Sequence, residues 1–136
     1  KLRGLEGLSK TSEWVPLPAR FLFSKNQAVV EPELEGLIAD SAELIRPRMD
    51  EGGDIRQVEI KGYTCFEGRS DELALERAHV VRDQLIELGL DAEGLVIETS
   101  HCDDILNYDR YEPDNLAMRM VSLRALIVRQ RGCSGD

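Results

Sequence analysis

The order of apolar periodicities along the chain is the feature that most restricts its fold. Some stretches alternate apolar and polar side chains, as half-buried strands do, and others repeat every three to four residues, as helices do. The strand-like stretches are residues 20–24, 56–64, 95–100 and 118–128, and the helical ones are residues 32–47 and 70–88. The predicted order is therefore β-α-β-α-β-β, an α/β (α+β) fold in which a mixed sheet carries both helices on one face.

The two predicted helices begin and end at residues that commonly start, cap or end helices. Pro32 suits a first helical position, and Pro47 is expected to end or kink the helix. Ser70 is a suitable N-cap for the second helix, and Gly89 stands where a C-terminal cap is expected. The apolar stripes that should face the sheet are Leu34, Leu37, Ile38, Leu44 and Ile45 in the first helix, and Ala74, Ala78, Val81, Leu85 and Leu88 in the second.

Length and charge limit the domain count and the class of partner. The 136 residues suit one domain, which we place at residues 18–130, after a tether at residues 1–17 and before a tail at residues 131–136. The net charge of −9 argues against nucleic acid and anionic membrane surfaces as partners. No apolar run approaches the ~20 residues that span a bilayer. No pattern indicates a cofactor, and we expect a protein that is not an enzyme.

Three cysteines, Cys65, Cys102 and Cys133, are too widely spaced for a CxxC motif or a compact zinc site. One pair can be bridged, which would suit an oxidising compartment. Residues 101–104 contain the side-chain types that bind zinc, but adjacent residues cannot all point at one ion, so we expect a polar loop there.

Four segments, taken in order along the chain, carry a family resemblance. The most specific is the second helix, where Leu73, Arg77-Ala78 and Val81 match a family motif in spacing. The other three are Phe23-Ser24-Lys25-Asn26 before the first helix, Gly62-Tyr63-Thr64-Cys65 at a strand end, and Met118-Arg119-Met120-Val121 opening the last strand. Together they resemble the OmpA-like family, which includes peptidoglycan-associated lipoproteins and the periplasmic parts of flagellar stators. The resemblance spans roughly residues 21–128 and implies the fold predicted above.

The resemblance also implies a ligand site. In the family, an aspartate and an arginine hold diaminopimelate of the peptidoglycan stem peptide by charge pairing. Arg77 keeps the arginine, whereas Cys65 stands at the aspartate position, and either Asp71 or Glu67 is a candidate replacement. The alternative for Arg77 is an ion pair with one of these two acids. The peptidoglycan-binding residues implied are Thr64, Cys65, Ser70, Asp71, Leu73, Arg77 and Arg119.

The family fold places the loops that carry Cys65 and Cys102 next to each other beside the pocket. This implies a Cys65–Cys102 disulfide, which would stabilise the fold by roughly 3–4 kcal/mol. The alternative is two free thiols. Cys133 is expected to remain free.

Two functions follow from the resemblance. The first is a non-catalytic periplasmic domain that binds the diaminopimelate stem peptide through an altered site and anchors a larger membrane-anchored or outer-membrane-associated protein to the cell wall. The second keeps the fold but has lost the ligand, and serves as an interaction or oligomerisation module with envelope proteins or other copies of itself.

Overall fold

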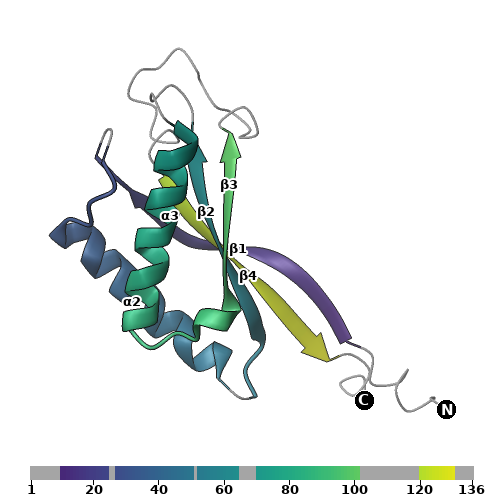
Figure 1. The fold of residues 1–136 in the computed structure, drawn as a ribbon. Helices are drawn as coiled ribbons and strands as arrows, with labels where there is room; N and C mark the ends of the chain where they lie inside the picture. Colours follow the sequence, from purple (N-terminus) through teal and green to yellow (C-terminus); the bar gives the residue numbers. More distant parts are fainter. Residues whose placement is uncertain (1–9, 25–26, 51, 65–69, 102–119, 131–136) are drawn as a thin grey trace.

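The structure is a computed structural model that describes residues 10–24, 27–50, 52–64, 70–101 and 120–130. Its elements follow the predicted order, with one added turn of 3-10 helix before the third strand (Figure 1). In chain order they are β1 (Lys10–Leu22), α2 (Pro32–Met49), β2 (Ile55–Thr64), α3 (Ser70–Glu87), η1 (Ala92–Gly94), β3 (Leu95–His101) and β4 (Met120–Gln130).

The four strands form one mixed sheet in the order β1-β4-β2-β3. β4 is antiparallel to both of its neighbours, and β2 and β3 run parallel, with α3 as the crossover between them. The prediction of a mixed sheet with two helices is confirmed. Because β2 and β3 are parallel, their carboxyl ends lie at the same end of the sheet.

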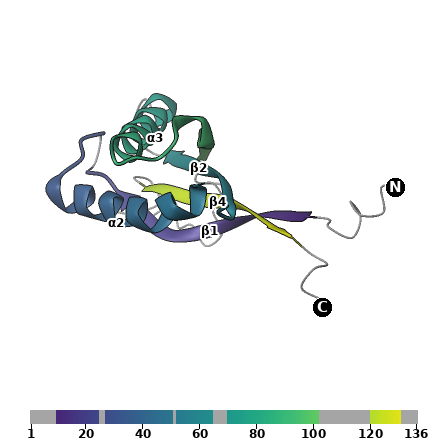
Figure 2. The ribbon, with the colours of Figure 1, turned by 90° about the horizontal axis from the view of Figure 1, so that it is seen from below.

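One face of the sheet forms the core with both helices (Figure 2). β4 shows the predicted alternation, because its odd-numbered residues from Val121 to Ile127 are buried while the even-numbered ones between them are not. Residues that pair across the sheet, such as Ile60 with Leu123, place their side chains on this same face. The helices contribute Leu34, Ile38, Ala42, Ile45, Ala78, Val81 and Leu85.

The first strand differs from the prediction, because β1 begins at Lys10 rather than at Arg20. Residues 10–16, part of the stretch that we assigned to a tether, pair with the carboxyl-terminal half of β4, as Trp14 does with Leu126. Pro16 and Pro18 do not end the strand because β1 is an edge strand. A proline has no N–H group to donate, and the outer side of an edge strand has no neighbouring strand that needs this donor. The register shift between Pro16 and Arg20 accommodates the prolines.

Two details of α2 also differ from the prediction. Pro47 does not end the helix at its own position, since α2 continues to Met49. Leu37 and Leu44, predicted in the buried stripe, are 51% and 61% exposed. The buried stripe instead includes Ala42, so the helix is rotated away from the two leucines.

In α3 the predicted Gly89 cap is present. Gly89 has a positive φ of 104°, and the Leu90 N–H donates to the Leu85 carbonyl.

An ion pair joins the end of α2 to the start of β2. The Arg48 guanidinium donates to both carboxylate oxygens of Asp54, at 2.9 and 2.6 Å, and this hydrogen bonding lowers the pKa of Asp54. A carboxyl group whose pKa is lower in the folded state stabilises the fold above its unfolded pKa of about 3.9. That contribution is lost as the pH falls through the folded pKa.

We therefore expect Asp54→Asn to be less stable than the wild type near neutral pH and equally stable at about pH 2. The two side chains are 42% and 36% exposed, so solvent screening limits the difference to about 0.2–1 kcal/mol. Urea unfolding at both pH values measures it. In a double-mutant cycle with Arg48→Gln, additive effects of the two substitutions would contradict the assignment to this pair.

Candidate functional site

The ends of several strands and of one helix lie at the end of the sheet where the parallel strands finish. Thr64, the last residue of β2, pairs with His101, the last residue of β3, and α3 begins nearby at Ser70 (Figure 1). The pairing of Leu22 with Met120 brings the end of β1 to the start of β4. Ligands of open α/β sheets commonly bind outside the carboxyl ends of the strands. Of the residues predicted to bind peptidoglycan, the described backbone of Thr64 and of the start of α3 lies at this end.

Arg77 lies two turns into α3 and is fully buried, at 0% exposure. Its Nε donates to the Gln27 carbonyl oxygen at 2.8 Å and its Nη2 donates to the Ser24 carbonyl oxygen at 3.0 Å. The guanidinium carbon lies 5.6 Å from the centre of the Phe23 ring. Arg77 thus connects α3 to the segment between β1 and α2, 50 residues away in the sequence.

The buried Arg77 guanidinium needs hydrogen-bond partners within the protein. A charged group loses its hydration when it is buried, and protein hydrogen bonds have to replace the lost water contacts. Bonds from a guanidinium to carbonyl oxygens are charge-assisted, and each contributes about 1.5–3 kcal/mol. The two carbonyls therefore hold the guanidinium plane in one orientation. Sequence patterns do not reveal such partners, because any residue can supply a backbone carbonyl.

The other predicted binding residues are placed only in part. Thr64 ends β2, Ser70 and Asp71 open α3, and the half-buried Leu73 lies one turn before Arg77. The structure describes the backbone of Thr64, Ser70 and Asp71 but not their side chains. The roles of these residues, and the predicted ion pair of Arg77 with Asp71 or Glu67, therefore remain predictions.

Four predicted residues lie outside the described part of the chain, namely Cys65, Glu67, Cys102 and Arg119. Cys133 lies outside it as well, so the described residues include no cysteine. The Cys65–Cys102 disulfide stays a prediction that nothing in the described residues supports.

A second polar cluster occupies the sheet face that is opposite the helices. Arg124 donates to both carboxylate oxygens of Glu59, at 2.8 and 3.1 Å, and stacks 4.8 Å from the centre of the Trp14 ring. The hydrogen bond to Glu59 raises the pKa of Arg124. Sequence reasoning missed this cluster. The alternation of β2 and β4 places both residues on the face away from the helices, but the pairing of Glu59 with Arg124 depends on the register between the two strands. The arrangement provides a cross-strand ion pair.

The described residues contain no group of three or more His, Cys, Asp or Glu side chains that could hold a metal ion. The zinc-type side chains at residues 102–104 fall outside them. Neither described helix has the length and apolar character of a membrane-spanning segment.

No protein-family description and no curated protein matches this sequence. Solved structures do match, at low identity. The OmpA-like domain of FopA1 from Francisella tularensis is 17% identical, with a TM-score of 0.59 over 94% of this chain and 87% of that one. The cell wall anchor of the T6SS from Pseudomonas aeruginosa is 17% identical, with a TM-score of 0.62 over 93% of this chain and 92% of that one.

The peptidoglycan-associated lipoprotein from Burkholderia pseudomallei is 19% identical, with a TM-score of 0.57 over 82% of this chain and 90% of that one. The match to these three structures extends over most of both chains in each comparison. It agrees with the element order and mixed sheet described above. This protein therefore has the fold of an OmpA-like domain.

Proposed function

We propose that this domain binds peptidoglycan without catalysing a reaction, in the periplasm and as part of a larger envelope protein. Two of the structures with the same fold are a peptidoglycan-associated lipoprotein and a cell wall anchor, and these names support the proposal. The observation that carries it is the buried guanidinium of Arg77 near the sheet end where the parallel strands finish.

In this proposal Arg77 anchors a carboxylate of the stem peptide, and diaminopimelate is the group that supplies it. The guanidinium presents a rigid planar fork, and a carboxylate fits such a fork through two parallel hydrogen bonds. The carbonyls of Ser24 and Gln27 orient the fork before the ligand arrives. Preorganisation of this kind lowers the entropy cost of binding.

Because Arg77 is buried, binding of a carboxylate requires a local rearrangement of the protein. Because the side chain is 0% exposed, a carboxylate reaches it only if protein atoms around the guanidinium move aside. We therefore expect association to include a local opening step. Its rate constant should lie below the roughly 10⁵–10⁷ M⁻¹s⁻¹ that is typical of preformed sites.

The same burial favours a second candidate function. If Arg77 serves only to hold the β1–α2 segment, the fold is an interaction or oligomerisation module that does not bind peptidoglycan. The absence of the family's aspartate, where Cys65 stands, is consistent with this alternative. Direct binding measurements distinguish the two functions.

We expect purified peptidoglycan to sediment the wild-type domain, and Arg77→Lys to weaken binding about tenfold or more. Lysine keeps the charge but loses the planar fork, so one of the two parallel hydrogen bonds to the carboxylate is lost, and a charge-assisted hydrogen bond contributes about 1.5–3 kcal/mol. Free diaminopimelate should compete. Cosedimentation at fixed ionic strength measures both effects.

Arg82→Lys is a matched control. Arg82 also lies on α3 and also donates to two backbone carbonyls, those of Leu95 and Ala92, but towards the opposite end of the helix. This variant should bind as the wild type does. Wild-type protein that stays in the supernatant would support the interaction module, and equal binding by both lysine variants would exclude Arg77 as the anchor.

A further inference from the structure

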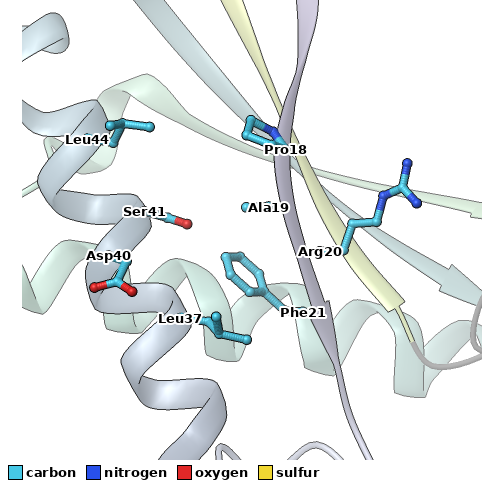
Figure 3. A pocket seen from close by; sticks show the side chains of 8 residues that line it. All are labelled: Pro18, Ala19, Arg20, Phe21, Leu37, Asp40, Ser41 and Leu44. Carbon is cyan, nitrogen blue, oxygen red and sulfur yellow. The ribbon is translucent and has the colours of Figure 1, made fainter.

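An open groove of about 690 Å³ separates α2 from the edge strand β1 (Figure 3). Leu37, Ser41 and Leu44 project into it from α2, opposite Pro18, Ala19 and Phe21 of β1. Its lining is mainly apolar. The groove lies beside the middle of α2 and includes none of the residues assigned to peptidoglycan binding, so it is independent of the proposed function.

The two leucines of the groove are much more exposed than core residues. Leu37 is 51% and Leu44 is 61% exposed, whereas Phe21 beneath them is 1% exposed. The two leucines are seven positions apart, with the small Ser41 between them. Large apolar side chains around a small one form a hole that receives a side chain of a partner helix.

The edge strand argues against a partner that adds a strand. Strand addition requires backbone N–H donors along the free edge, and proline has none. Pro18 lines the groove, Pro16 lies two residues before it in the same strand, and the register shift that follows Pro16 further disturbs the edge. The occupant that fits this groove is therefore a helix.

Charge indicates which kind of helix fits. Glu33 and Asp40 are exposed and share the stripe of Leu37 and Leu44, since these four residues are spaced by four, three and four positions. Arg20 also lines the groove, but its side chain extends to the side of β1 that is away from α2 (Figure 3). A second copy docked through the same stripe would bring these acids together in a chain of net charge −9. The surface therefore favours a basic partner.

We infer that this groove binds an amphipathic, basic helix of a partner protein, whose apolar side chains pack on Leu37 and Leu44 while its lysines or arginines face Glu33 and Asp40. This is the helix-in-groove mode of recognition. The two leucines supply the apolar contacts, and the acids select the sign of the partner's charge.

The test uses two synthetic helical peptides of about 18 residues, or five turns. One has leucines at helical spacing with lysines elsewhere, and the other has glutamates in place of the lysines. Fluorescence anisotropy at physiological ionic strength should show that the lysine peptide binds the wild-type chain. Binding to Leu37→Gln/Leu44→Gln, and binding of the glutamate peptide, should each be about tenfold weaker or more.

Leu75→Gln is the matched control, because Leu75 is a 43% exposed leucine on the other helix. We expect it to bind the lysine peptide as the wild type does. Equal affinity for the double variant, or equal affinity for the two peptides, would overturn the inference. So would a wild-type dimer in sedimentation equilibrium that the double variant dissociates, because the occupant would then be a second copy.

Discussion

Gly62→Ala is expected to destabilise the domain by about 3 kcal/mol, near the upper end for an overpacked position. A Cβ atom at Gly62 would overlap the backbone carbonyl oxygen of Ala74 and approach the carbonyl carbon to 2.9 Å. Both atoms belong to the backbone of α3, so no side chain can move aside. The strand and the helix would have to separate, and Arg77 lies only three residues beyond Ala74.

Urea unfolding measures this effect, and Gly36→Ala is its control. Gly36 lies within α2, and a Cβ atom there meets nothing within 4 Å. Alanine at this position should therefore stabilise the domain by about 0.5–1 kcal/mol through helix propensity. A Gly62→Ala variant with the wild-type midpoint would show that β2 and α3 are not packed backbone to backbone.

Arg77→Ala is expected to lower the free energy of unfolding by about 3–5 kcal/mol. The substitution leaves the Ser24 and Gln27 carbonyls without their guanidinium donor and creates a cavity in a fully buried position. An unpaired buried acceptor costs about 1–3 kcal/mol. Loss of binding by this variant would therefore be ambiguous, which is why the peptidoglycan test uses lysine.

Arg82→Ala is the comparison for this prediction. Its two bonds to carbonyl oxygens are longer, at 3.4 and 3.2 Å, and the side chain is only half-buried. We expect a loss of about 1 kcal/mol. If the two alanine variants unfold at the same urea concentration, the Arg77 bonds do not hold the β1–α2 segment in place.

The candidate site was predictable only in part, and mainly through the family resemblance. The Leu73 and Arg77-Ala78 spacing identified the helix and the arginine, and the structure places that arginine near the end of the sheet where β2 and β3 finish. Its bonds to Ser24 and Gln27 were not predictable, because they depend on how the β1–α2 segment meets α3.

Periodicity by itself determined the element order, the buried faces of β2 and β4, and the stripe of α3 from Ala74 to Leu85. These features depend on residues that are close in sequence, where the repeat of the backbone decides which side chains share a face. Tertiary structure alone decided where β1 begins, that α2 turns Leu37 and Leu44 outward, and that Glu59 meets Arg124. Each of these depends on a partner far away in the chain: β1 extends because β4 continues beside it, and α2 is oriented by the sheet on which it packs.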